Sequence, residues 1–585
     1  MKPQETHLLE FGPFRIDVGE RLLRRGTDVI PLTPKAIETL IILASSGGRV
    51  VEKEDLIKRV WPNTFVEEVG LARNISVLRK VLGEGHDDSQ YIETIARRGY
   101  RFIAPVSEIR GDSAESRSLA VLPLVNLSNN PDEDFFADGM TDELISCLMK
   151  VEALHVSSRT SVMTYKGVRR SLRQIARELN VLWVVEGTVL HSEGRVRISA
   201  RLIDGTTEKH LWTATYEKDM RDVLALQNEV ASEIACAIRV KMSIPEQARL
   251  AQSRPIIPEA YQDYLRGRYF WNNRTTEGLK RARDYFQKAI ENDPTYAPAH
   301  SGLADAYAVL GSTGYDVMPP AEAMPLAKAA AMKALQIDDG LAEAHAALGY
   351  VKLVYDWDWA GAERELLRAI ELNPGYATAH QWQGELLMGL SRSAEATEAF
   401  RRALELDPLS IPCNLGLGWS HYFSRNYDLA IEQHRRTLEI APNVPMALYG
   451  LGLAYHHKKR PEQGISELKR ALKFFEGEPA AVMLMSVTHA ISGKREAAVR
   501  DLERLQQLSQ QRYVPAVYSA FVYIVLNDLD NAFEWLNKAC AERSSYLIFL
   551  NAQPSLDKLR SDPRYLDLLK RVGLKLDAPS RRLSN

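Results

Sequence analysis

The sequence predicts three unlike domains: a small α+β domain, an α/β domain and a long all-helical repeat array. Short strands and amphipathic helices alternate through the first hundred or so residues. A second mixed pattern of apolar strands and helices begins near residue 117, after a short polar segment. From residue 258 onward strand signals end and the sequence becomes self-similar. We therefore place the domains at residues 8–106, 117–245 and 258–573, which suits a chain of 585 residues.

The composition is that of a folded globular protein. Apolar residues make up 45% and charged residues 26% of the chain. The formal net charge of -2 gives no overall attraction to nucleic acid, so any such contact must come from a local patch. Apolar runs are far shorter than the ~18 residues of a membrane-spanning helix, and Met1–His7 lacks the apolar core of a secretion signal. We expect a cytoplasmic protein that does not contact membranes.

The cysteines are few and scattered. The four positions are Cys147, Cys236, Cys413 and Cys540. They lack the paired spacing of a zinc site or a disulfide framework, so we expect buried reduced thiols. We predict neither a metal site nor a cofactor.

The first domain begins with short strands. Phe14–Asp17, Leu22–Arg25 and Val29–Ile30 are separated by turns at Gly19 and Gly26, which predicts a small antiparallel sheet.

Three helices follow this sheet. Thr33 as N-cap and Pro34 at the first helical position start one helix, and Glu52–Val60 forms the next. The third begins near Val66 and has two unlike faces at 100° per residue. Its apolar stripe comprises Leu71, Ile75, Leu78 and Leu82. Its opposite face carries Arg73, Ser76, Val77 and Lys80. One face can pack on the domain while the other enters a major groove.

A β-hairpin tipped by arginines closes the domain. Tyr91–Ile95 and Tyr100–Ile103 read as its strands, with Arg97 and Arg98 in the turn between them. The runs Val66–Leu82 and Tyr91–Phe102 resemble the winged helix-turn-helix domains of the OmpR/PhoB family, over nearly all of residues 8–105. The resemblance implies that the third helix reads base edges of double-stranded DNA and that the hairpin, or wing, enters the flanking minor groove. It also implies that the loop after Trp61 contacts RNA polymerase.

Position and charge divide the candidate DNA contacts. Three exposed side chains suit base edges: Arg73, Ser76 and Val77. Three basic side chains suit phosphates: Lys80, Arg97 and Arg98. Asn74 and Arg79 lie at the margins and could do either. Many relatives carry arginine at the position of Val77, where an apolar contact would favour a thymine methyl over guanine.

Two expectations about control follow from this domain. Such a module covers only ~600 to 1,000 Å² and specific sites usually recruit two, so we expect a homodimer or tandem binding on DNA. About seven residues precede the first strand, which leaves no room for a phosphorelay receiver. Membrane-tethered relatives of the ToxR/CadC type carry a spanning helix after the winged domain, and residues 108–117 cannot form one.

The middle domain has an α/β pattern. Its predicted strands lie at Leu119–Val125, Leu154–Val156, Trp183–Val185 and Arg195–Leu202, and its helices at Asp134–Leu148, Ser171–Leu179 and Val223–Lys241. Several segments, among them Phe136–Leu144 and Leu202–Gly205, resemble TolB-like N-terminal domains. That family implies no catalytic residue here, and we interpret Asp138, Asp142 and Glu143 as charges placed near a helix N-terminus. The sequence leaves open whether a crevice of the α/β domain binds a small ligand.

The last region repeats every 34 residues, as 403 - 369 = 34 illustrates. One column comprises Ala369, Ala403, Thr437, Ala471, Leu505 and Ala539, and another Gly384, Gly418, Gly452, Ser486 and Ala520. We count about eight repeats that resemble the tetratricopeptide (TPR) family, followed by a capping helix near residues 566–572. Stacked helix pairs form a superhelix whose concave groove binds a protein or peptide partner.

Three histidines in the array invite a metal interpretation. His300, His345 and His380 each end the same Ala-Xaa-Ala-His motif, and we interpret them as repeat structure rather than ligands. No nucleophile with a base, phosphate loop or metal spacing is present in the sequence, so we predict that the protein is not an enzyme.

The sequence leaves two functions open. The first is a DNA-binding transcription regulator whose repeat array receives a signal. The alternative is an interaction scaffold whose winged helix has a structural or protein-binding role. The near balance of 16 basic and 15 acidic residues across Met1–Val106 keeps this alternative open.

Overall fold

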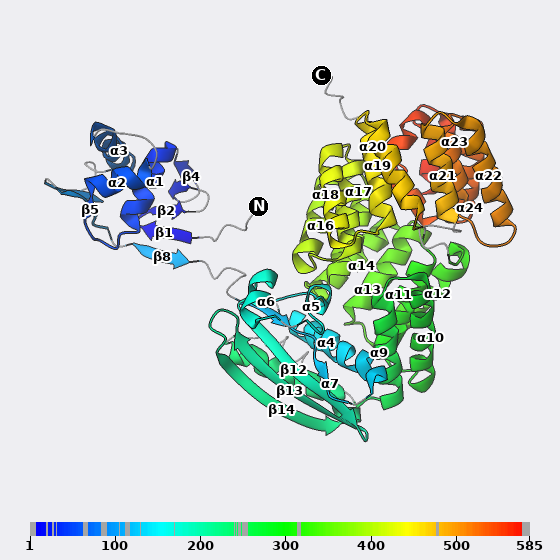
Figure 1. Ribbon diagram of the computed structural model, residues 1–585, viewed down its shortest axis with the longest axis horizontal. Helices are drawn as coiled ribbons and strands as arrows, with labels where there is room; N and C mark the ends of the chain where they lie inside the picture. The colour runs from blue at the N-terminus through cyan, green and yellow to red at the C-terminus, as the bar shows by residue number, and fades with distance from the viewer. Residues whose placement is uncertain are drawn as a thin grey trace. The chain divides into compact units, whose positions relative to one another are not determined.

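The structure, a computed structural model, describes most of the chain in two compact units, Met1–Arg117 and Ser118–Asn585. The described residues are 7–18, 21–25, 28–30, 32–61, 68–83, 91–96, 98–104, 106–110, 117–128, 130–151, 153–168, 170–238, 240, 243, 247, 255–312, 317–474 and 479–575. Figure 1 shows their helices and strands and labels many of them.

The first unit contains two small antiparallel sheets. In the larger sheet the strands are β1 (His7–Phe11), β2 (Phe14–Asp17), β3 (Leu22–Arg25), β4 (Asp28–Ile30) and β8 (Ser107–Arg110), in the order β4-β3-β2-β1-β8. The smaller sheet has the order β5-β7-β6, formed by β5 (Val51–Glu52), β6 (Ile92–Ile95) and β7 (Gly99–Phe102). The predicted strands of both sheets are confirmed, and β1, β5 and β8 are additional.

Three helices pack with these two sheets around one hydrophobic core. They are α1 (Pro34–Ala44), α2 (Lys53–Val60) and α3 (Glu68–Val81). The predicted N-cap of α1 is confirmed, because the Thr33 hydroxyl accepts a hydrogen bond from the Ala36 backbone N–H at 3.3 Å. Phe11 and Phe102 meet edge to face with ring centroids 4.9 Å apart in the shared core. The sheet and the helices therefore share one small core.

The second unit begins with a mixed sheet. Its strands are β9 (Ser118–Val121), β10 (Val125–Asn126), β11 (His155–Val156), β12 (Trp183–Ser192), β13 (Arg195–Asp204) and β14 (His210–Asp219). The order is β11-β9-β12-β13-β14, with β10 beside β12; β11, β9 and β12 are parallel, and β13 and β14 continue antiparallel. The helices of this region are α4 (Asp134–Met149), α5 (Arg159–Met163), α6 (Leu172–Leu179) and α7 (Val223–Ala237), with short 3-10 turns η2 (Pro131–Glu133) and η3 (Met220–Asp222). The sequence pattern did not reveal β14, because outward-facing and half-buried residues alternate along it without a buried apolar face.

A helical array completes the second unit. The first helices of its eight described pairs are α9 (Pro258–Asn272), α11 (Ala297–Leu310), α13 (Ala342–Val351), α15 (Ala377–Gly389), α17 (Ile411–Phe423), α19 (Pro445–His457), α21 (Pro479–Ile491) and α23 (Ala516–Val525). The second helices are α10 (Thr276–Asn292), α12 (Pro320–Ile337), α14 (Trp359–Leu372), α16 (Ser393–Leu406), α18 (Tyr427–Ile440), α20 (Pro461–Leu472), α22 (Arg495–Ser509) and α24 (Leu529–Ala541). A π-helical turn, η4 (Lys352–Asp356), interrupts the third pair, and η5 (Ser545–Phe549), η6 (Pro554–Leu559) and the predicted capping helix α25 (Pro563–Arg571) end the chain's described part.

The mixed sheet region and the array share one hydrophobic core. Leu144 and Leu148 of α4 belong to the same buried cluster as Tyr261 and Leu265 of α9. Gly139 of α4 permits this approach, because a Cβ atom there would lie 2.8 Å from the Leu265 Cδ2 atom. Figure 1 shows α4 beside α9. The two regions therefore fold as one compact unit.

The array's far end returns to its third pair. The Trp359 indole N–H of α14 donates a hydrogen bond of 2.8 Å to the Val572 carbonyl, just after α25. No helix in the described ranges is both long and apolar enough to span a bilayer.

Candidate nucleic-acid interface

Helix α3 has the two faces that its sequence predicts. The apolar stripe is buried in the core of the first unit: Leu71, Ile75, Leu78 and Leu82. The opposite face is exposed: Arg73, Ser76, Val77 and Lys80. Val77 keeps 38% of its surface exposed, which is a large apolar area for a helix surface position. The face thus combines two cations, one hydroxyl and one apolar contact.

Asn74 is turned away from this face. It is half-buried, and its Nδ2 donates a hydrogen bond of 3.3 Å to the Thr39 hydroxyl of α1. Thr39 donates in turn to the Lys35 carbonyl at 2.7 Å. Asn74 therefore fixes the packing of α3 on α1. Thr39 was not singled out in the sequence, because a threonine on an apolar helix face gives no signal of its partner.

Arg79 fastens α3 to the wing. Its Nη2 donates to the Ile92 carbonyl at 2.7 Å and to the Thr94 hydroxyl at 2.9 Å, both on β6. Hydrogen bonds from a charged donor are stronger than neutral ones, so this contact sets the position of the hairpin relative to α3. The sequence left open whether Arg79 contacts base edges or phosphates, and in the structure its Nη2 is engaged by β6.

The wing tip is only partly described. Arg97 lies outside the described residues, as does the loop that follows Trp61. Arg98 is exposed, and its carbonyl accepts a hydrogen bond from the Lys53 N–H at 3.1 Å. Gly99 is required beside it, because a Cβ atom there would lie 2.0 Å from the Val51 carbonyl oxygen of β5. The contact between β5 and β7 thus sets the base of the arginine turn.

The three repeated histidines are structural in the described array. The imidazole Nε2 of each lies 3.0 to 3.1 Å from a backbone carbonyl six residues earlier. The pairs are His300 with Pro294, His345 with Asp339 and His380 with Pro374. Among the described residues, no group of three or more His, Cys, Asp or Glu side chains is placed to hold a metal ion. The repetition that we inferred from sequence therefore corresponds to one repeated hydrogen bond.

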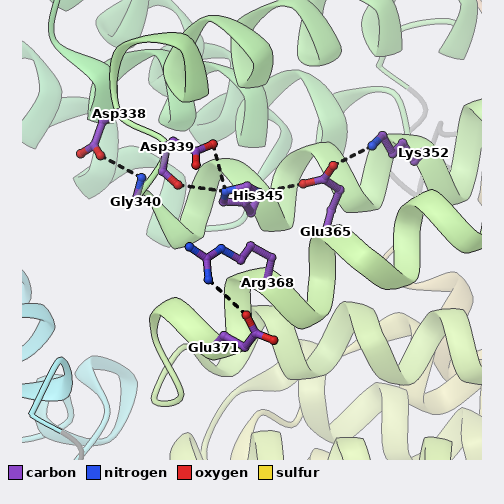
Figure 2. Close-up of polar contacts among 8 residues, drawn as sticks. All are labelled: Asp338, Asp339, Gly340, His345, Lys352, Glu365, Arg368 and Glu371. Atoms are coloured by element: carbon purple, nitrogen blue, oxygen red, sulfur yellow. Dashed lines mark hydrogen bonds and ion pairs between the residues drawn. The ribbon is translucent and has the colours of Figure 1, made fainter. Parts of the chain in front are cut away.

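His345 also belongs to a local ion network (Figure 2). Its Nδ1 lies 2.7 Å from Glu365, and Lys352 donates to the other Glu365 oxygen at 2.7 Å. The hydrogen bond with His345 holds the pKa of Glu365 at about 2. Burial lowers the pKa of His345, but its hydrogen bonds to Glu365 and to the Asp339 carbonyl, together with the charges of both carboxylates, outweigh burial and raise that pKa overall. This network joins α13, η4 and α14.

The interpretation of Asp138, Asp142 and Glu143 as N-terminal helix charges is wrong. Helix α4 begins at Asp134, so all three residues lie beyond its first turn. Asp138 pairs with Lys166 at 2.7 Å within the same region. Asp142 lies 3.6 Å from Arg268 of α9, and Glu143 accepts a hydrogen bond of 3.2 Å from Tyr264. The last two carboxylates therefore meet polar groups of the array, and burial raises the pKa of Glu143 to about 7.

Three family models match parts of the chain. Residues 26–102 match the C-terminal domain of transcriptional regulatory proteins, and residues 115–233 match the second domain of HilA/YgeH-like transcriptional regulators. Residues 352–411 and 415–479 match the tetratricopeptide repeat. The chain therefore has an N-terminal winged-helix DNA-binding domain, a middle region with a β-sheet and an all-helical TPR array.

Known proteins resemble the chain over different lengths. A protein of Rhizobium meliloti (strain 1021) named as an adenylate cyclase is 39% identical over 187 residues, which is 32% of each chain. The transcriptional regulator HilA of Salmonella typhi is 23% identical over 73% of this chain and 76% of its own length. The transcriptional activator CadC of Escherichia coli (strain K12) is 33% identical over 102 residues, 17% of this chain and 20% of its own. Thus the chain spans about a third of the first relative and a fifth of the last. Together with the family models, the regulator matches support a DNA-binding transcription regulator that carries a TPR module.

Proposed function

We propose that the protein regulates transcription by binding double-stranded DNA through the exposed face of α3 and the wing. The observation that carries this proposal is the two-faced α3, whose buried stripe fixes its orientation while Arg73, Ser76, Val77 and Lys80 face outward. In this proposal Arg73, Ser76 and Val77 meet base edges in the major groove. Lys80, Arg97 and Arg98 bind phosphates.

Asn74 and Arg79 have a different part in the proposal. Both are engaged within the domain, by Thr39 and by β6 respectively. They support the interface by holding α3 and the wing in place, and they contribute to DNA affinity through geometry rather than through a direct contact.

The partners are part of the same proposal. Two copies bind repeated half-sites, because one winged helix covers too little DNA for high specificity. The loop after Trp61 contacts RNA polymerase, and the TPR array takes a protein or peptide partner. We also propose that the middle region, which matches the second domain of HilA/YgeH-like regulators, is related to TolB-like N-terminal domains. We propose a non-enzymatic role, since a transcription regulator aligns over 73% of this chain and the cyclase over only 32%.

The experiment compares DNA binding of the full-length chain and matched variants. Arg73→Ala combined with Lys80→Ala should weaken binding to a duplex selected from a random library. Each lost phosphate contact should flatten the slope of log affinity against log salt by ~0.9. Arg368→Ala is the control, because it removes an exposed arginine from the array that pairs only with Glu371 at 3.2 Å in the described structure (Figure 2).

Two results discriminate the proposal from a scaffold. Val77→Arg should shift the selected sequence toward guanine at one position of each half-site, since arginine binds guanine O6 and N7 bidentately. If the Arg73 and Lys80 variant keeps full affinity and an unchanged salt slope, the winged helix does not bind DNA through this face and the regulator proposal is wrong.

A further inference from the structure

Two polar side chains on α11 are buried without a hydrogen-bond partner in the described structure. Asp305 is 1% exposed and neither of its carboxylate oxygens has a partner. Ser301 lies one helical turn earlier, is 2% exposed and has an unpartnered hydroxyl. A buried polar group without a partner costs ~1 to 3 kcal/mol, more when charged, so such a pair on one helix face is unusual.

The charges around Asp305 come from the first helices of neighbouring repeats. Glu343 of α13 and Arg268 of α9 act on it electrostatically, as does Arg274, which follows α9. Glu343 is only half-buried, so solvent reaches this side of the group. We call Ser301, Asp305 and Glu343 the Asp305 cluster.

The cations around this group are engaged by other residues. Arg268 is already engaged by Asp142 of α4 at 3.6 Å. Arg274 lies over the Trp271 ring, 3.7 Å from its centroid, and makes no ion pair within 4.0 Å in the described part of the chain. Lys150, at the end of α4, acts on Glu343. Asp305 thus has only the fields of Arg268 and Arg274, and neither guanidinium contacts its carboxylate in the described structure. The group lacks a cation in direct contact with Asp305.

We propose that the Asp305 cluster binds an organic ammonium ion, with Asp305 and Ser301 accepting its N–H groups. A small primary amine fits the orphan acceptors, because an ammonium carries three donors and no acceptor. Burial raises the pKa of Asp305 to about 7, so ionising it without a cation is costly. A bound ammonium offsets that cost. The site lies where α4 meets the array, so its occupancy braces the contact between the two regions.

The test uses thermal unfolding of the full-length chain with 1,4-diaminobutane. We expect the transition temperature to rise by about 1 to 3 °C at saturating amine, relative to sodium chloride of equal ionic strength. The neutral isostere 1,4-butanediol should give no rise. N-acetyl-lysine amide identifies the source of the ammonium: a rise with this compound alone indicates a lysine side chain, and a rise with the diamine indicates a free amine.

Asp305→Asn distinguishes a ligand site from a structural carboxylate. This change should raise the transition temperature without amine, because it removes a buried group that is costly to ionise, and it should abolish the rise with amine. Asp339→Asn is the matched control, since the Asp339 side chain is 83% exposed on the same array. A fall in stability of Asp305→Asn, or retention of its amine response, would overturn the proposal.

The amine response should also depend on pH. The groups that face Asp305 are Arg268, Arg274, Glu343 and Tyr376, from α9, the segment after it, α13 and the segment before α15. Since only the ionised Asp305 attracts an ammonium, the rise should be larger at pH 8 than at pH 6. A larger rise at pH 6, or no response to either amine in the wild-type chain, would refute the site. DNA binding has no part in this readout, so its outcome is independent of the proposed regulator function.

Discussion

Replacing His434 by phenylalanine should stabilise the protein, and more so in acid. His434 lies on α18, is fully buried, and neither ring nitrogen has a hydrogen-bond partner in the described structure. Its ring is clamped between Gly418 of α17 and Gly450 of α19, where Cβ atoms would lie 2.5 Å and 2.3 Å from ring atoms. Burial lowers the pKa of His434 to about 3, so the ring is neutral in the folded chain.

The preceding repeat shows that a phenyl ring fits this place. Phe400, 34 residues earlier, is held in the same way between Gly384 and Gly416. Removing an unpartnered buried polar ring should gain ~1 to 3 kcal/mol, and fitting the larger ring costs part of this. We expect a net gain of ~1 kcal/mol at pH 7.5.

The dependence of stability on pH gives a more specific prediction for this substitution. Because the folded-state pKa of His434 is lowered, the unfolded chain binds the proton first as the pH falls below ~6.5. The free energy of unfolding of the wild-type chain therefore falls between pH ~6.5 and pH ~3, and at pH 5 the loss is ~2 kcal/mol. His434→Phe abolishes this loss, so its advantage over wild type should grow from ~1 kcal/mol at pH 7.5 to ~3 kcal/mol at pH 5.

The assay is urea unfolding of the full-length chain at both pH values. His434→Ala serves as a control that removes the ring and leaves a cavity, at a cost of ~2 to 4 kcal/mol. An advantage of His434→Phe that is equal at pH 5 and pH 7.5 would show that His434 titrates normally and would refute the reasoning.

Substitutions at two further positions probe hydrogen bonds of the array. Glu365→Gln should lower the free energy of unfolding by ~1 to 2 kcal/mol near pH 6, because it removes the ion pair with His345. This pair stabilises the fold between the unfolded pKa of Glu365, ~4.5, and the raised pKa of His345. In thermal unfolding the cost should shrink as the pH rises above that histidine pKa, and a constant cost would contradict the ion pair. His380→Leu should cost ~1 kcal/mol in urea unfolding and His380→Asn less, because Asn414, 34 residues later, donates the equivalent bond to the Pro408 carbonyl at 3.0 Å. Equal costs for the two His380 variants would show that this bond contributes nothing.

Local patterns were sufficient to predict the two faces of α3. The stripe that includes Leu71 and Ile75 is set by helix geometry alone, and the structure buries it as expected. The same geometry could not decide between contact modes for Asn74 and Arg79. The partner of Asn74, Thr39, lies 35 residues away, and the β6 partners of Arg79 lie 13 or more residues away. The periodicity of a single helix carries no information about contacts at such separations. Sequence therefore predicts which side of α3 faces outward better than which polar residues remain available there.

The packing of α4 on the array shows a second limit of the sequence. Asp142 and Glu143 are charged residues on a helix, and most such residues are solvated. Their partners Arg268 and Tyr264 lie more than 120 residues later. The sequence pattern around α4 therefore predicts the helix itself but not what the helix packs against. Burying those carboxylates becomes tolerable only because the array supplies a guanidinium and a phenol, and that compensation appears only in the folded chain.

A second contact joins the sheet region to the array far from Arg268. The Ser158 and Thr160 hydroxyls donate to the two carboxylate oxygens of Asp407 at 2.8 Å and 2.9 Å. Asp407 lies between α16 and α17, whereas Arg268 lies on α9, so the sheet region is held at the first repeat and again at the junction of the fourth and fifth. Because a superhelix changes shape by small rotations between successive repeats, a bend between these two points must lengthen one of the contacts. The curvature of this part of the array and the seating of the sheet region are therefore mechanically coupled.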